Sequence, residues 1–194
     1  MCGIVPRAEL KFGAMARIEI APVTRETWRD FARLFEARGG PRYCWCAPYR
    51  FRDAHEMDAA AKKTGMRGLV TRGVPIGVLA YVGGEPVGWC SVAPRETYVK
   101  LERSRTMPRR TPPETPTWTV LCFFVKRPFR KQGVARALLD GAIAHARSQG
   151  AAILEAYPFD TAGQTATHRG HSSLFAAAGF EQEDERRWFL RLRR

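Results

Sequence analysis

The chain has 194 residues, of which 45% are hydrophobic and 11% aromatic. This length and composition fit one globular domain with its own core and exclude a disordered or collagen-like chain. The longest apolar runs, residues 118–125 and 151–154, are far shorter than the ~20 residues that a membrane-spanning helix needs, so we expect no membrane partner. The formal net charge is +13, from 32 Lys and Arg against 19 Asp and Glu.

The positive charge raises nucleic acid, an acidic membrane surface and a polyanionic small ligand as partners. Six of the 32 basic residues are lysines and the other 26 are arginines. An arginine excess together with many Ala, Gly and Pro residues is typical of GC-rich coding, which is a simpler explanation of the charge. The basic residues are scattered, and only residues 103–110 and 186–194 approach clusters. We therefore expect one anionic ligand and treat nucleic acid as the weaker alternative.

Five cysteines, an odd number, occur without a preceding secretory signal peptide. They predict free thiols in a reduced, cytoplasmic protein rather than a disulfide framework. Cys44 and Cys46 are the only close pair, and no second pair lies at zinc-binding spacing, so we expect no metal. We interpret both as buried packing residues, since no base partner marks them as nucleophiles.

The first third of the chain predicts a leader, a strand and two helices. Residues 1–14 lack periodicity and are expected to form a disordered leader before a single domain over 15–194. Residues 17–22 alternate apolar and charged side chains, as in a half-buried strand. Apolar residues at helical spacing follow over 28–35, and a second helix is expected over 55–66. The expected boundary residues are Thr24 as the first N-cap, Gly39 and Gly40 at the first helix end, and Gly65 and Gly68 at the second.

The middle of the chain predicts a hairpin followed by irregular structure. Two apolar strands, 76–82 and 87–93, flank the turn sequence Gly-Gly-Glu-Pro at 83–86. Residues 98–103 predict a helical turn, and the proline-rich residues 107–116 predict a loop.

The last third predicts a strand–loop–helix–strand unit. Residues 118–125 form a continuous apolar run, typical of a strand buried on both faces. Residues 135–149 have one apolar stripe, as in an amphipathic helix, and residues 151–157 predict the next strand. Because a helix connects the two strands, we expect them to pair in parallel.

The chain closes with a short helix and an edge strand. Ser172 or Ser173 is expected to cap the helix, which ends at Gly179, and residues 187–192 alternate as a strand. A further short strand over 181–185 is left open. The order of elements predicts one α/β domain with a mixed sheet.

The chemistry is expected in the basic loop between the buried strand and the helix after it. The first turn of a helix offers unpaired backbone N–H groups and the positive end of its dipole, which together suit a phosphate. Gly133 lets the backbone approach a bulky anion, and Ala135 keeps the next position small. The sequence contains neither GxxxxGK[ST] nor GxGxxG, which argues against a P-loop or dinucleotide fold. A plain basic surface loop is the alternative reading.

The pattern Arg130-x-x-Gly133-x-Ala135, five residues after Val125, resembles the acyl-CoA signature of the GNAT superfamily of N-acetyltransferases. The element order from residue 18 to the C-terminus is also similar. This resemblance implies a central mixed sheet of six to seven strands, about four flanking helices, and a splay between the fourth and fifth strands. It also implies acetyl-CoA as co-substrate and no metal.

The resemblance places the cofactor on one segment of the chain. The backbone N–H groups of residues 131–136 and the Arg130 side chain would hold the pyrophosphate. The strand end at 123–125 would pair with the pantetheine arm and polarise the thioester carbonyl. The implied cofactor-binding residues are Phe123, Phe124, Val125, Arg130, Lys131, Gln132, Gly133, Val134, Ala135 and Arg136.

The implied reaction is direct attack of an acceptor amine on the acetyl thioester. A primary amine with a pKa of ~10.4 is only about 0.1% neutral near pH 7, so a base or water relay would help. Glu155 is the candidate base, with His168 and His171 as weaker ones. Many family members carry a Tyr that protonates the leaving thiolate, but Phe175 stands at that position here. Tyr157, Ser172 or Ser173 would have to substitute.

The acceptor is expected to be an amine of a small molecule or a protein. Its pocket would lie among aromatic residues of the early helices and the hairpin; the alternative is that these residues simply pack helix against sheet. Two rival functions remain: a non-catalytic acyl-CoA binder, favoured by Phe175, and a nucleic-acid-binding module, favoured by the charge. A homodimer is left open. The candidate pocket residues are Tyr43, Trp45, Trp118 and His171, with Tyr49 and Tyr98 beside them.

Overall fold

The computed structural model describes residues 17–160 and 168–192, so the predicted leader at 1–14 lies outside the described residues. Its centre is a seven-stranded sheet in the order β1-β2-β3-β4-β5-β7-β6. Neighbouring strands are antiparallel except β4 and β5, which pair in parallel. The strands are β1 (Ile18–Pro22), β2 (Val78–Val82), β3 (Glu85–Pro94), β4 (Thr117–Val125), β5 (Ile153–Ala156), β6 (Glu181–Gln182) and β7 (Trp188–Arg191).

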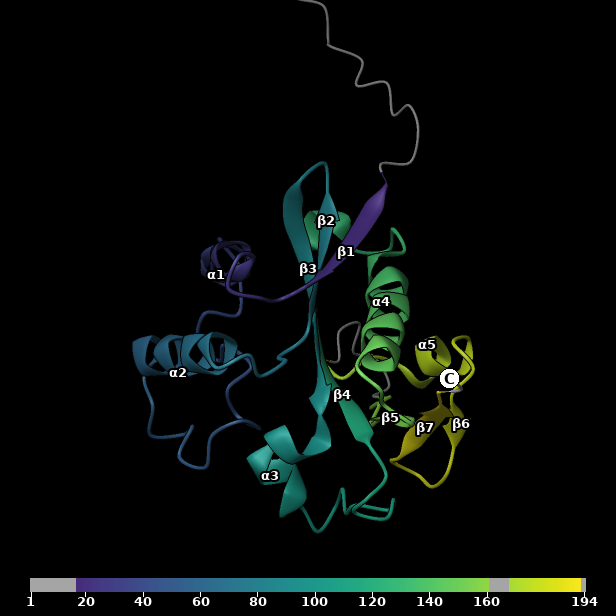
Figure 1. The fold of residues 1–194 in the computed structure, drawn as a ribbon. Helices are drawn as coiled ribbons and strands as arrows, with labels where there is room; N and C mark the ends of the chain where they lie inside the picture. Colours follow the sequence, from purple (N-terminus) through teal and green to yellow (C-terminus); the bar gives the residue numbers. More distant parts are fainter. Residues whose placement is uncertain (1–16, 161–167, 193–194) are drawn as a thin grey trace, which may run out of the picture.

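Helices cover both faces of this sheet (Figure 1). α1 (Trp28–Glu36) and α2 (Ala59–Thr71) lie on one face, and α4 (Val134–Ser148) and α5 (Ser172–Ala176) lie on the other. A four-residue helix, α3 (Val99–Glu102), follows β3. Within the described ranges, no helix is long and apolar enough to cross a membrane. The predicted α/β fold with a mixed sheet is confirmed.

Each face of the sheet packs against its helices through a hydrophobic cluster of its own. Leu138, Leu139 and Ala142 of α4 pack on the sheet together with Phe175 of α5. On the opposite face, the aromatic residues of α1 and the segment after it pack against Trp89 of β3. The side chains of β3 and β4 contribute to both clusters because neighbouring residues of a strand point to opposite faces.

The splay between the fourth and fifth strands arises from unequal strand lengths. β5 pairs with β4 only from Thr117 to Val120, so residues 121–125 of β4 extend beyond it. The register of β4 with β3 also shifts here: Ser91 faces Cys122 and Val92 faces Val120, which leaves Leu121 as an extra residue. A bulge of this kind bends a strand and redirects its backbone groups. β4 and β5 therefore separate at the bulge in β4, which opens the splay.

Several predicted element boundaries were wrong. α2 runs through Gly65 and Gly68 instead of stopping there. A Cβ at residue 65 would stand 2.8 Å from the Phe51 ring, so this glycine serves close packing inside the helix. The helix begins after Asp58, whose carboxylate accepts a hydrogen bond of 2.7 Å from the Ala61 N–H.

The predicted N-caps of α1 and α5 were also wrong. The N-cap of α1 is Thr27, while Thr24 lies in the turn before it and donates its N–H to Thr27 Oγ1 at 2.9 Å. α1 ends at Glu36, before Gly39. The N-cap of α5 is His171, and Ser172 is already helical. The serine hydroxyl bonds instead to Asp160, a partner 12 residues away that helix periodicity does not reveal.

We expect the stability of the fold to fall in mild acid because of His145. This residue of α4 lies edge-on to Trp118, with 5.4 Å between ring centroids, and burial lowers its pKa. The unfolded chain then binds more protons than the folded chain, so stability is lost as the pH falls below about 6.5. Melting temperatures at about pH 7.5 and 5.5 should differ less in His145→Gln than in the original chain. If the melting temperature fell by the same amount in both proteins, His145 would not be the cause of the acid sensitivity.

Candidate functional site

The predicted anion loop lies between β4 and α4. A 3-10 turn, Arg127–Phe129, leads from the strand to Gly133, which is the N-cap of α4. Gly133 has φ 80° and ψ −4°, in the left-handed region that favours glycine. No atom lies within 4 Å of where its Cβ would be, so the backbone conformation and not crowding inside the protein requires glycine here. Lys131 is also left-handed, at φ 59°.

The backbone of this loop offers a row of unused donors. Within the described chain, no acceptor lies in hydrogen-bond range of the N–H groups of residues 131–136. The first intrahelical bond runs from the Ala137 N–H to the Gly133 carbonyl at 3.0 Å. Free N–H groups at a helix N-terminus, on an exposed glycine turn, form an arrangement that suits a phosphate.

Two basic side chains at the loop and the start of α4, those of Arg130 and Arg136, are held in place by neighbouring groups. Arg130 Nε donates to the Val125 carbonyl at 3.0 Å, which folds the side chain back over the end of β4. Arg136 binds Asp140 at 2.9 Å and the Ala177 carbonyl at 2.9 Å, and so links α4 to α5. Arg136 therefore has a structural role in addition to any contact with an anion.

The backbone edge of β4 faces the splay. The Phe123 N–H donates to the His168 carbonyl at 2.5 Å, and the Val125 carbonyl accepts from Arg130. Neither partner belongs to β3, so these two groups point to the edge that β5 leaves open. A ligand that paired with β4 here would replace the His168 carbonyl.

Glu155 is the centre of a buried ion cluster. Its carboxylate is 0% exposed and contacts Arg95, Thr119 Oγ1 at 2.9 Å and Arg187 Nε at 2.9 Å. Arg95 and Arg187 each have a second, more exposed carboxylate partner, Glu102 and Glu183. Both carboxylate oxygens of Glu155 are therefore engaged, Oε1 by Arg95 and Thr119 and Oε2 by Arg187, and we do not propose it as the general base.

Sequence reasoning missed Arg95 and Arg187, which surround Glu155. Arg95 is fully buried and also donates to the Met107 carbonyl at 2.8 Å, which anchors the proline-rich segment to the sheet. Nothing in the local pattern distinguishes these arginines from the other 24 in the chain. A buried acidic residue in a strand was the one available signal, because such a charge needs a partner.

Tyr157 lies beside this cluster, at the end of β5. Its hydroxyl accepts a hydrogen bond from Arg95 Nη1 at 3.1 Å, and burial raises its pKa. It borders a cavity of about 590 Å³, which also receives side chains of the segments after β5 and before β7. The charged residues that line this cavity are Asp160, Arg169, Glu185 and Arg186.

The other candidate acids and bases occupy the segment around α5. Ser173 is exposed on that helix. Asp160 accepts a hydrogen bond of 3.0 Å from the Ser172 N–H and lies 3.4 Å from His171 Nδ1. Phe175 is fully buried, edge-on to Phe180 at 5.2 Å between centroids.

The four predicted pocket residues do not form one pocket. Trp45 is buried in the cluster under α1, whereas Trp118 is buried under α4 on the opposite face of the sheet. Tyr43 is 73% exposed, and His171 lies beside Asp160. Residue spacing could not show this, because the face that each tryptophan occupies depends on how the sheet is covered. Trp45 and Trp118 are packing residues, which agrees with the alternative stated for them.

The cysteines also serve packing. Cys46 is buried, and its thiol accepts a hydrogen bond from Trp89 Nε1 at 3.1 Å. The neighbouring Cys122 thiol and burial raise the pKa of Cys46, which disfavours a reactive thiolate. Among the described residues, no cluster of His, Cys, Asp and Glu has a geometry that could hold a metal ion.

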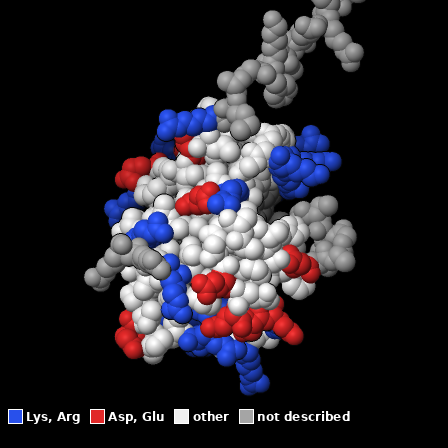
Figure 2. Space-filling model, turned by 90° about the vertical axis from the view of Figure 1, so that its right-hand side faces the viewer, with Lys and Arg blue, Asp and Glu red and all other residues white. Residues whose placement is uncertain are grey.

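Charge is mixed on the face that carries α4 and α5. Figure 2 shows basic and acidic side chains interspersed over that face, around an uncharged centre. The excess of +13 is thus not gathered into one continuous basic surface on this side.

Comparison with known proteins identifies the family. The sequence pattern of the acetyltransferase (GNAT) family matches residues 28–169, which include β4, the Gly133 loop and β5. The chain belongs to this family, as the signature around Gly133 predicted. No curated protein matches the chain significantly.

Solved structures of N-acetyltransferases have the same fold at low sequence identity. An N-acetyltransferase from Staphylococcus aureus Mu50 is 14% identical, with a TM-score of 0.55 over 92% of this chain and 100% of that one. The aminoglycoside N-acetyltransferase AAC(6')-Iy in complex with CoA is 15% identical, with a TM-score of 0.56 over 94% and 95%. The Escherichia coli protein YhbS in complex with CoA is 14% identical, with a TM-score of 0.52 over 93% and 84%.

Proposed function

We propose that this protein transfers an acetyl group from acetyl-CoA to a primary amine of a small molecule or protein. The observation that carries the proposal is the Gly133 loop, with its left-handed glycine and free N–H groups at the start of α4. This loop follows directly from a strand whose edge faces a splay. Two of the solved N-acetyltransferase structures that share the fold contain CoA, which supports acetyl-CoA as co-substrate.

The loop and the strand have separate tasks in this proposal. The N–H groups of residues 131–136 and the Arg130 guanidinium bind the pyrophosphate. The edge of β4 at Phe123 and Val125 pairs with the pantetheine amides after the His168 carbonyl moves away. Backbone N–H groups at the bulge stabilise the charge that develops on the thioester oxygen, and one such donor is typically worth ~3 kcal/mol.

In the chemical step, the amine nitrogen forms a bond to the acetyl carbon and the carbon–sulfur bond breaks. The ammonium form must lose one proton before attack, and the nitrogen loses a second one after its bond to carbon has formed. A water relay to solvent through the cavity beside Tyr157 takes up both protons. The leaving thiolate of CoA has a pKa of about 8.5 and departs without full protonation. Phe175 has no proton to give, so the Tyr described for many family members is not required by this scheme.

Tyr157 is our candidate for stabilising the leaving thiolate, ahead of Ser173. Arg95 holds its hydroxyl as an acceptor, which leaves the phenolic proton free to point into the cavity. Because the pKa of Tyr157 is raised, this proton would be donated as a hydrogen bond rather than transferred. The rival function, a non-catalytic acyl-CoA binder, is favoured only by Phe175.

Thermal melting tests the cofactor part of the proposal. Acetyl-CoA at 100 times its Kd should raise the free energy of unfolding by about 2.7 kcal/mol, and the shift should grow with concentration. A release assay for the CoA thiol with a panel of amines then separates the enzyme from a binder. No shift at millimolar acetyl-CoA would contradict the proposal, and a shift without thiol release for any amine would favour the binder.

A further inference from the structure

A trough of about 870 Å³ lies between α1 and α2, on the face of the sheet opposite α4. Its volume is within the range of small-molecule sites. Trp28 and Val70 contribute apolar side chains, but the polar part of its lining is almost entirely cationic. The charged residues that line it are Arg25, Arg29, Arg33, Glu36, Lys63 and Arg67.

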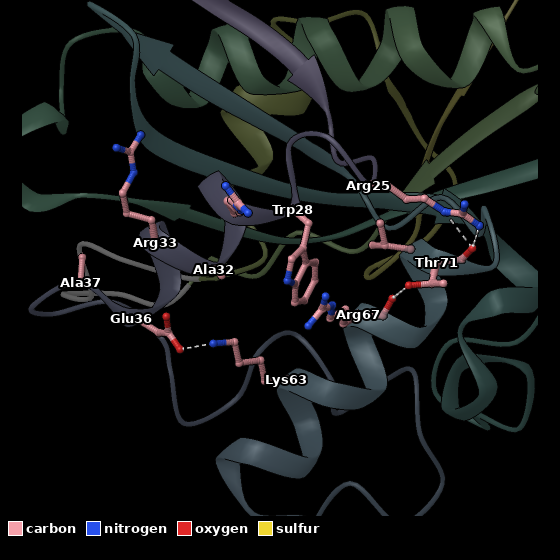
Figure 3. Close-up of a pocket in the computed structure, with 11 residues that line it drawn as sticks. Arg25, Trp28, Ala32, Arg33, Glu36, Ala37, Lys63, Arg67 and Thr71 are labelled. Atoms are coloured by element: carbon pink, nitrogen blue, oxygen red, sulfur yellow. Dashed lines mark hydrogen bonds and ion pairs between the residues drawn. The ribbon is translucent and has the colours of Figure 1, made fainter.

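Contacts across the trough close it at both ends (Figure 3). At one end, Arg25 Nε donates to the Thr71 carbonyl at 3.1 Å. At the other end, Lys63 and Glu36 form an ion pair at 2.5 Å and neutralise each other. The space between these bridges is therefore short, and it suits a compact ligand better than a long polymer.

The middle of the trough has positive charge without a counter-charge. The guanidinium groups of Arg29 in α1 and Arg67 in α2 form neither hydrogen bonds nor ion pairs with any described residue, although the Arg67 carbonyl accepts a hydrogen bond from Thr71 Oγ1. Figure 3 shows the guanidinium of Arg67 turned toward the indole of Trp28, inside the trough. Arg33 points away in the same view and is paired with Asp30 at 3.1 Å. Arg25 also interacts with the carboxylate of the neighbouring Glu26, so its charge is partly compensated.

We infer that this trough is a binding site for a compact polyanion that carries phosphate or carboxylate groups. Guanidinium groups bind such oxyanions through pairs of parallel hydrogen bonds, and the two uncompensated charges here, Arg29 and Arg67, are both arginines. An anion between Arg29 and Arg67 would bridge α1 to α2 and stabilise their contact. This site is independent of the Gly133 loop, because α1 and α2 cover the other face of the sheet from α4.

The test uses pyrophosphate and citrate as separate probes, in thermal melting and calorimetric titration of the full chain. Both solutions are matched in ionic strength with sodium chloride. We expect saturable stabilisation, with the Kd raised about tenfold or more in the double variant Arg29→Ala, Arg67→Ala. Both residues are exposed on helices, where alanine is well tolerated. Binding of only one probe assigns the site to that oxyanion.

The matched control is Arg103→Ala with Arg147→Ala, which removes the same charge from exposed positions outside the trough. It should bind both probes like the original chain. Because pyrophosphate can also bind the Gly133 loop, both probes are titrated against Gly133→Val as well, in which the binding that remains reports the trough alone. The Arg29, Arg67 variant should retain acetyl-CoA binding. The inference is overturned if neither probe binds, if both double variants lose binding equally, or if only Gly133→Val loses it.

Discussion

Replacing Gly133 with valine is expected to abolish acetyl-CoA binding while the fold survives. The residue has φ 80°, which a β-branched side chain adopts only with strain, and its Cβ position faces open space where the pyrophosphate would lie. Valine would turn away or block two backbone N–H groups that donate to the phosphate, and this should weaken acetyl-CoA binding by about 100-fold. Thermal melting with acetyl-CoA should then show no stabilisation at concentrations that stabilise the original chain.

Gly150 provides the matched control at the other end of the same helix. It also has φ 80° and no atom within 4 Å of its Cβ position. Gly150→Val should therefore suffer a similar loss of stability, of about 1–2 kcal/mol or more, from the same backbone strain. Acetyl-CoA should still stabilise it. An unchanged acetyl-CoA affinity in Gly133→Val would place the pyrophosphate elsewhere.

Glu155→Gln is expected to destabilise the fold strongly. The substitution leaves Arg95 and Arg187 buried beside an uncharged amide, and losing one partner of a buried ion cluster costs about 3–5 kcal/mol. The second carboxylates, Glu102 and Glu183, should keep the loss near the lower limit. Urea unfolding of both proteins measures the difference.

The control for this second prediction is Glu183→Gln. Glu183 also pairs with Arg187 but is 39% exposed, so its loss should cost less than about 1 kcal/mol. If Glu155 were instead the general base, Glu155→Gln would lower kcat with little effect on unfolding. That result would contradict the structural role.

Local patterns were enough to predict the strand–loop–helix–strand unit. The periodicity of residues 135–149, the apolar run before them and the glycine at 133 predict α4, β4 and the turn between them. Each of these signals depends on residues a few positions apart. The boundaries of α2 and α5 were missed because Phe51 and Asp160, which decide how residues there pack and bond, lie well before these helices in the sequence.

The candidate site was predicted only in part for the same reason. Glu155 was noticed as a carboxylate on the strand beside the cofactor, but its partners are 60 and 32 residues away. The separation of Trp45 from Trp118 depends on which helices cover which face. The trough between α1 and α2 likewise exists only after the two helices lie side by side.

By itself, the sequence determined the fold class, the family and the position of the glycine turn between β4 and α4. These follow from short-range periodicity and from the backbone freedom of one glycine. The tertiary structure alone decided where the remaining charge acts. It placed Arg95 and Arg187 around a buried carboxylate and left Arg29 and Arg67 without a counter-charge, since ion pairs form between side chains that folding brings together from distant parts of the chain.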